Sequence, residues 1–469
     1  MRLKEVIQAL VPFALLAGAT SAWSAADPTL LKARQKFFGI DNVDVNTGAV
    51  KKDKVIASWA TNTTYVVSVM GRVILLDSYI TKPELPTTPI DRRYSPLLPQ
   101  DLIDVRPEAI FLGHGHGDHA DNAAYIAKWT NATIYATPET CDVMQQDVAR
   151  MWADPNPQNG GAKVVPNPNP VNCVGAVPRG SRPGQYNQGP NAGLSKSSVS
   201  KLSTPLDAQV CVLAFKFIHS GGSPVDPSFP HTTLNDLGDP RYPGRTITTP
   251  PPPVTYPAMF PNLTPYTPPA TGAVAGQLDT RTTGFGGPAG AYEVVYQFIL
   301  RNGYNFNFFY LNSAGPAKEG IGSDIDLVTL AQYNDPTFPQ ERKDLARAIG
   351  NSLYDLMDTL PRTDVLLGSI VSLGAAANQQ RDIILATQRL RPKVYIPGHH
   401  TDVAQKGSGI YHMISWKETA VNMGWPQSEW PEFRLLMDPN DFLVPQVWSP
   451  GDARWFDATK AGRVAQLCG

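Results

Sequence analysis

Residues 113–122 read Gly-His-Gly-His-Gly-Asp-His-Ala-Asp-Asn, which concentrates three of the chain's eight histidines in one short stretch. The apolar run 108–112 before it predicts a buried strand, and apolar residues at helical spacing after Asn122 predict a helix. Its three glycines let the backbone bend sharply. We therefore predict a strand-to-helix loop, with Asp121 or Asn122 capping the helix. The loop carries four side chains of metal-ligand type: His114, His116, Asp118 and His119.

Imidazole nitrogens and carboxylate oxygens are ligands that zinc takes in proteins. Four such groups in one tight turn cannot all reach a single ion, but they can serve two adjacent ions. We predict that His114 and His116 bind one ion and that Asp118 and His119 bind the other. The alternative is a polar surface loop, but scattered surface histidines rarely flank an aspartate directly after a buried strand.

Further ligands are expected at the ends of other strands, because a catalytic zinc site usually has three protein ligands and one open position. For the first ion we favour His219, which ends an apolar run, over His231, which lies in a proline-flanked loop. A hydrogen-bonded histidine at a strand end is the alternative for His219. For the second ion we assign His399, which follows the strand-like run 393–396. His400 points elsewhere on an extended backbone, so we expect it to contact a ligand residue or the substrate.

Two acidic residues have different expected roles. Asp77 ends the strand-like run 72–76, so it either supports the metal ligands from behind or is a simple turn residue. Asp118 is the expected catalytic residue, which orients the nucleophile and also ligates the second ion when one is bound.

The N-terminus predicts export. Arg2 and Lys4 give a positive start, 11–19 is apolar and small residues follow, so we predict a signal peptide over 1–26. The apolar run is short for a bilayer span of ~20 residues, and no stable membrane anchor is expected. A membrane anchor is the alternative. The protein is therefore expected in the periplasm or the extracellular medium.

The 469 residues carry a net charge of −1, which argues against a nucleic-acid partner. We predict one metallo-hydrolase domain over 27–469. Of the whole chain's 44 prolines, 24 fall between residues 151 and 290, which predicts irregular insertions at about 152–206 and 222–290, with a single strand between them. Outside them the elements alternate between strands and helices: helices over 30–38, 123–130, 138–151, 340–358, 379–390 and 412–421, and strands over 65–70, 72–76, 108–112, 133–136, 210–218, 292–300, 305–311, 364–367 and 393–396.

The cysteine count is even, and an exported protein with four cysteines is expected to form up to two disulfides, with three possible pairings. Metal ligation is the alternative. Cys211 lies eight residues before His219 on one strand, and hence ~26 Å from it at ~3.3 Å per residue. The four residues are Cys141, Cys173, Cys211 and Cys468.

The motif His-x-His-x-Asp-His after a strand, a later histidine at a strand end and a final Pro-Gly-His together resemble the metallo-β-lactamase superfamily. The resemblance is greatest to its small bacterial metal-dependent hydrolases, near the ascorbate-6-phosphate lactonase-like branch. It implies a mixed α/β fold, an αβ/βα four-layer sandwich with the metals at one edge. About half of the chain carries it, outside the proline-rich insertions: 66–81, 107–140, 210–221 and 363–402.

The chain departs from this family at one position. The family places an aspartate that bridges the two ions in a turn after a strand, and the matching stretch here, 310–315, contains no acid. Asp324 and Asp326 follow later, but their spacing does not place them on the metals. A bridging carboxylate offsets the repulsion between two cations, so we expect the second ion to bind less tightly.

The expected function is an exported hydrolase that binds one or two zinc ions and cleaves an ester, lactone or phosphoester of a small molecule with a metal-bound hydroxide. The alternative is a metal-binding scaffold, or a homologue that has lost activity, whose insertions bind a partner. The intact set of five histidines favours the first, and the missing bridging acid favours the second. Neither a particular substrate nor an oligomeric state follows from the sequence.

Overall fold

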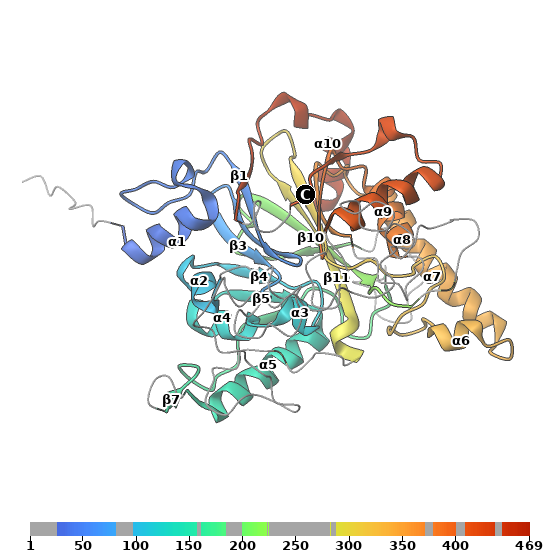
Figure 1. Cartoon of the computed structure of the whole chain (residues 1–469), viewed down its shortest axis with the longest axis horizontal. Coiled ribbons are helices and arrows are strands. Elements are labelled where there is room, and N and C mark those ends of the chain that lie inside the picture. The colour runs from blue at the N-terminus through green and yellow to red at the C-terminus, as the bar shows by residue number, and fades with distance from the viewer. Residues whose placement is uncertain are drawn as a thin grey trace, which may run out of the picture.

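Two seven-stranded sheets pack face to face, and helices cover both outer faces (Figure 1). This computed structural model confirms the predicted αβ/βα sandwich. It describes residues 26–80, 97–156, 161–183, 199–222, 224, 282, 288–370, 379–399, 409–436 and 443–469. The predicted signal peptide lies outside these residues apart from Ala26, and so does most of the second insertion.

The first sheet has the order β16-β1-β2-β3-β4-β5-β8. Strands β16 to β3 pair antiparallel, and β3, β4, β5 and β8 pair parallel. In chain order the strands are β1 (Val55–Thr61), β2 (Thr64–Val69), β3 (Arg72–Leu76), β4 (Ala109–Phe111), β5 (Thr133–Ala136), β8 (Cys173–Gly175) and β16 (Gln446–Trp448).

The second sheet has the order β15-β14-β13-β12-β11-β10-β9. Strands β9 to β12 pair antiparallel, and β12 to β15 pair parallel. Its strands are β9 (Ser200–Leu202), β10 (Val210–Ile218), β11 (Tyr292–Leu300), β12 (Asn307–Leu311), β13 (Val365–Ser369), β14 (Val394–Gly398) and β15 (Glu432–Phe433).

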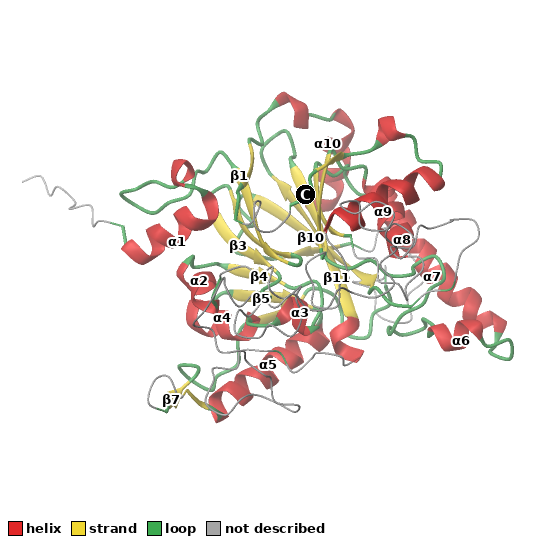
Figure 2. Cartoon of the chain, in the orientation of Figure 1, coloured by secondary structure: helices red, strands yellow, loops and turns green. Residues whose placement is uncertain are grey.

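Helices form the two outer layers (Figure 2). The first sheet is covered by α1 (Pro28–Phe38), α2 (Pro99–Asp104), α4 (Ala123–Thr130) and α5 (Pro138–Ala153). The second is covered by α7 (Gln340–Thr359), α8 (Gln379–Leu390) and α9 (Gly409–Asn422). Further helices are α3 (Gly117–Ala120), α6 (Leu330–Asn334) and α10 (Ala458–Cys468). Each helix described is too short or too polar to cross a bilayer.

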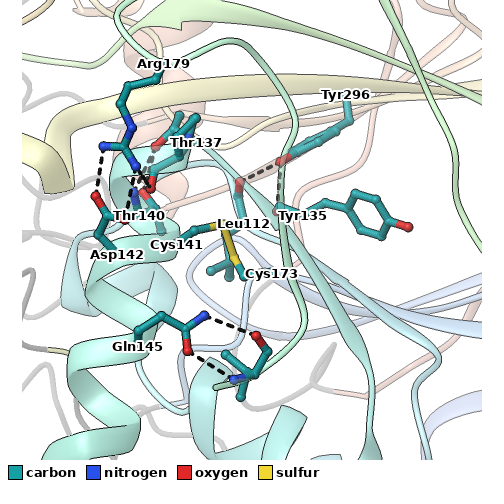
Figure 3. The surroundings of a disulfide bond; sticks show 12 residues. Leu112, Tyr135, Thr137, Thr140, Cys141, Asp142, Gln145, Cys173, Arg179 and Tyr296 are labelled. Atoms are coloured by element: carbon teal, nitrogen blue, oxygen red, sulfur yellow. Dashed lines mark hydrogen bonds and ion pairs between the residues drawn. A yellow bond between two sulfur atoms is a disulfide. The ribbon is translucent and has the colours of Figure 1, made fainter. Parts of the chain in front are cut away.

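Successive side chains along a strand point to opposite faces of the sheet, so neighbouring residues pack into different layers. Within β4, Ile110 packs with the helices of the first layer, whereas Phe111 packs between the sheets. Tyr296 of β11 crosses the interface, and its hydroxyl contacts the carbonyls of Leu112 and Tyr135 at 3.0 Å each (Figure 3). A hydroxyl has one proton, so it can donate to only one of these carbonyls at a time. This polar contact fixes how the sheets meet beside the His-rich loop.

Several expected details differ from the structure. The loop after β4 contains a short helix, α3, which Gly117 to Ala120 form before α4 begins. Asn122 is the N-cap of α4 but makes no side-chain capping bond, since its amide donates to the carbonyl of Ser78.

The proline-rich region contains more strands than the single one expected. The strands β8 and β9 extend the two sheets, and β6 (Pro155–Asn156) pairs with β7 (Ala162–Lys163) in a separate ribbon. These strands have two or three residues each, which is too short for a periodic pattern to reveal them.

All four cysteines form disulfides, so metal ligation by cysteine is wrong. Cys141 of α5 is bonded to Cys173 of β8 (Figure 3), and Cys211 of β10 is bonded to Cys468 at the end of α10. The bonds span 32 and 257 residues, so the second constrains the unfolded chain far more.

Replacing both cysteines of one pair by alanine should destabilise the protein unequally. Loop-closure entropy predicts a loss of about 4 kcal/mol for the 141–173 pair and about 5–6 kcal/mol for the 211–468 pair. Urea unfolding followed by tryptophan fluorescence measures the difference. Equal losses in the two double variants would contradict the entropic account.

Candidate metal centre

Four segments of the chain, the first two of them consecutive, bring the predicted ligands to one edge of the sandwich. The loop after β4 supplies His114 and His116, and α3 supplies Asp118 and His119. In the second sheet, His219 directly follows β10 and His399 directly follows β14. These segments meet because β4, β10 and β14 all end at the same edge. The six ligands predicted from the sequence are therefore neighbours in space.

The first set consists of His114, His116 and His219, whose ligand atoms all lie within 4.8 Å of one another. The Nε2 atoms of His114 and His219 are 3.1 Å apart. Two nitrogens bound to one tetrahedral zinc at about 2.0–2.1 Å would lie about 3.3 Å apart. The arrangement therefore fits three ligands of a single ion with a fourth position open.

The second set consists of Asp118, His119 and His399. Its three pairwise distances are 3.0 Å between the two histidine Nε2 atoms, 3.2 Å from Asp118 Oδ2 to His119 and 3.3 Å from Asp118 Oδ2 to His399. The sets adjoin, since the ring centroids of His114 and His119 are 4.0 Å apart. The two sets of ligand atoms thus lie side by side at the same edge of the sandwich.

The other histidines considered from the sequence are not placed here. His400 and His231 lie outside the described residues, and the side chain of His412 in α9 is not described either. The expected role of His400 beside the site therefore stays a prediction.

Burial sets the protonation of the first set. Loss of hydration lowers the pKa of His114 well below its usual value, and neighbouring histidines lower it further. The same causes lower the pKa of His219 to about 3. Both imidazoles are therefore neutral at pH 7, which is the state that binds a metal ion.

The pKa of His119 is raised instead of lowered. Burial lowers its pKa, but the carboxylates of Asp118 and Asp77 outweigh burial and raise the pKa to about 10. Without a metal ion, a proton on this ring compensates the two negative charges. A bound cation would replace that proton, so metal binding at this half of the site is coupled to proton release.

The structure places Asp77 behind the ligands, in the position expected for a supporting group. Its Oδ1 accepts the backbone N–H of Gly113 at 3.0 Å, and its Oδ2 accepts the Thr63 hydroxyl at 2.9 Å. His119 Nδ1 lies 2.7 Å from the same Oδ2. A carboxylate on Nδ1 fixes the tautomer in which Nε2 is free to bind metal.

Three neighbouring residues were not recognised in the sequence as parts of the site. Asn62 and Thr63 form the turn between β1 and β2, and Asn62 donates to the backbone carbonyl of Asp118 at 2.7 Å. The backbone carbonyl of Asn62 accepts the N–H of His399 at 3.0 Å. The third residue is Asn312, which contacts His114. No spacing in the sequence connects these residues to the histidines.

Asp324 and Asp326, the acids that follow the stretch without a bridging aspartate, are held in ion pairs. Asp324 pairs with Lys216, and Asp326 pairs with two arginines, Arg182 and Arg342. Asn312 itself directly follows β12, inside the stretch expected to carry the bridging acid.

Comparison with known proteins finds relatives for part of the chain. No protein-family model matches it. It is 34% identical over 107 residues to a UPF0173 metal-dependent hydrolase of Pyrobaculum aerophilum, and 30% identical over 107 residues to one of Pyrobaculum neutrophilum. Each match covers 23% of this chain and 42% of the relative, so the chain spans about two fifths of the length of these relatives.

Solved structures resemble the chain more broadly but weakly. Igni18, described as a novel metallo hydrolase of Ignicoccus hospitalis, has 12% identity and a TM-score of 0.38, covering 84% of this chain and 98% of that one. The sequence relatives are named metal-dependent hydrolases, which is the class of enzyme that the motif predicted.

Asp77→Asn should weaken zinc binding about 10–100-fold, because the amide no longer fixes the His119 tautomer as a carboxylate does. Competition with a chromophoric chelator measures the affinity. Asp364→Asn is the matched control, because Asp364 is also fully buried and accepts from Asn307 and Lys460. An equal loss of zinc affinity in both variants would show that Asp77 acts only through folding.

Proposed function

We propose that the protein is an exported zinc-dependent hydrolase of an ester, lactone or phosphoester bond in a small molecule. The observation that carries the proposal is the convergence of five histidines and Asp118 from four segments. The six residues form two sets of three, and the ligand atoms of each set are spaced to bind one ion. A polar surface loop would not need this geometry. The relatives' description as metal-dependent hydrolases supports the same class.

Zinc fits the donor set, since imidazole nitrogen with at most one carboxylate per ion is the ligation that catalytic zinc favours. When bound, such an ion lowers the pKa of water to about 7 and polarises the oxygen that takes up charge during hydrolysis. His114, His116 and His219 would hold the first ion. Asp118, His119 and His399 would hold a second.

The chain's own residues orient the attacking water and the metal ligands. Asp118 is only partly buried within the cluster and keeps 18% of its side chain exposed, so its carboxylate can accept a proton from an attacking water and align it. Asn62 anchors the backbone of Asp118, which fixes where that carboxylate points. Asp77 holds His119 from behind.

Export remains part of the proposal. The positive and apolar N-terminus supports a signal peptide over 1–26, and two disulfides suit a protein that resides in the periplasm or outside the cell. Near-neutral charge argues against a nucleic-acid partner.

The second candidate is a metal-binding scaffold without turnover, and the absence of an acid from 310–315, where a bridging aspartate was expected, favours it. Metal content followed by turnover of generic ester, lactone and phosphodiester substrates separates the two. Bound zinc with no turnover of any of them would favour the scaffold.

His116→Ala should lose turnover by more than the about 10–100-fold typical of supporting residues, because it removes a direct ligand. Circular dichroism should show that the fold is retained. His231→Ala is the control, since His231 is assigned to neither ion. Unchanged turnover in His116→Ala would refute the site.

Removing metal should abolish turnover, and adding zinc should restore it, because the reactive water depends on the cation. Dialysis against a chelator followed by zinc titration is the measurement. Full activity in a preparation shown to be free of metal by elemental analysis would contradict a metal-dependent reaction.

A further inference from the structure

Asn312 is buried directly behind the candidate ligands, at 1% exposure. Its Oδ1 lies 3.3 Å from His114 Nδ1, and its Nδ2 lies 2.9 Å from Asp77 Oδ2. The amide also lies against the backbone of Gly113, where a Cβ atom would come within 2.1–2.3 Å of it. Glycine at 113 is therefore what lets this amide reach between the loop and Asp77.

Chemistry fixes which way the amide faces. If it were reversed, its oxygen would meet the Asp77 carboxylate, which has no proton to give, and two acceptors would be buried against each other. With the nitrogen toward Asp77, the amide donates to the carboxylate, and its oxygen accepts from His114 Nδ1. The 3.2 Å approach of Asn312 Nδ2 to His119 Nδ1 then brings together two donors that share the Asp77 oxygen.

These contacts place the Nδ1 proton of each histidine on the side away from the ligand cluster. His114 carries its proton on Nδ1 and donates it to Asn312, while His119 carries its proton on Nδ1 and donates it to Asp77. The Nε2 atoms of the two rings are the ones that lie within 3.1 Å of His219 and His399. Every histidine contact of Asn312 is thus with the nitrogen that faces away from the ligand cluster.

We propose that Asn312 is a positioning residue of the metal centre, which holds His114 directly and His119 through Asp77, and that it does not stand in for a bridging ligand. This inference rests on the proposed metal site. It differs from the simple reading of Asn312 as a lost aspartate, according to which restoring the acid would complete the site for two ions.

The two readings predict opposite effects for Asn312→Asp. On our account the new carboxylate would lie about as close to Asp77 as the amide does now, without the donor that Asp77 requires. Two buried carboxylates in contact cannot both stay ionised without a strong penalty. The variant should therefore bind zinc more weakly. On the other reading it should bind a second ion more tightly.

The experiment compares the wild-type chain with Asn312→Asp and Asn312→Ala. Zinc stoichiometry is measured by elemental analysis, zinc affinity by chelator competition, and ligand geometry by the visible spectrum of the cobalt-substituted protein. We expect both variants to lose about 10–100-fold in zinc affinity, to gain no ion and to change the cobalt spectrum.

Asn307→Asp is the matched control. Asn307 is a fully buried amide at the opposite end of the same strand, and its Nδ2 donates to the carbonyl of Arg362. This variant should lower the urea midpoint of the metal-free protein but leave zinc affinity and the cobalt spectrum unchanged.

Three results would overturn the inference. A higher zinc stoichiometry or tighter binding in Asn312→Asp would show a latent bridging position. Unchanged affinity and spectrum in Asn312→Ala would show that the amide does not position ligands. If the wild-type protein binds no zinc at all, the proposed function fails together with the inference, whereas the first two results leave the proposed function standing.

Discussion

One buried carboxylate, Asp77, joins the parts of the site that the two sheets deliver separately. It accepts hydrogen bonds from the His-rich loop, from the β1–β2 turn and from Asn312 of the second sheet, and it contacts His119. A fully buried carboxylate is stable only when several donors surround it. The fold must therefore bring these segments together for Asp77 to be buried, and once together they hold the imidazoles in place.

The same carboxylate balances the charge of the cluster. Burial, and after it the neighbouring imidazoles, disfavour a positive charge on His114 and His219, which is why the pKa values of these two residues are low. Asp77 and Asp118 lie on the other side, where they favour a cation on or beside His119. The first set thus consists of neutral imidazoles, whereas the carboxylates lie beside the second set.

Much of this arrangement could be predicted from sequence. The long strands, the helix after Thr137 and the positions of His219 and His399 at strand ends follow from local apolar patterns, and strand ends gather at one edge of a sandwich. Local patterns could not reveal Asn62, Thr63 or the role of Asn312, because these residues reach the ligands only through contacts between distant segments.

Other features escaped prediction for different reasons. The strands β8 and β9 have three residues each and depend on the sheets that they extend. The disulfide pairing could not be deduced, since four cysteines allow three pairings and Cys211 and Cys468 are 257 residues apart.

The central claim is that residues from four segments bind one shared metal centre. Anomalous diffraction at the zinc absorption edge, from crystals of protein purified with zinc, tests it most directly. The account predicts a peak about 2.0–2.1 Å from nitrogen atoms of His114, His116 and His219. Zinc bound elsewhere on the chain, with no peak among these three imidazoles, would contradict it.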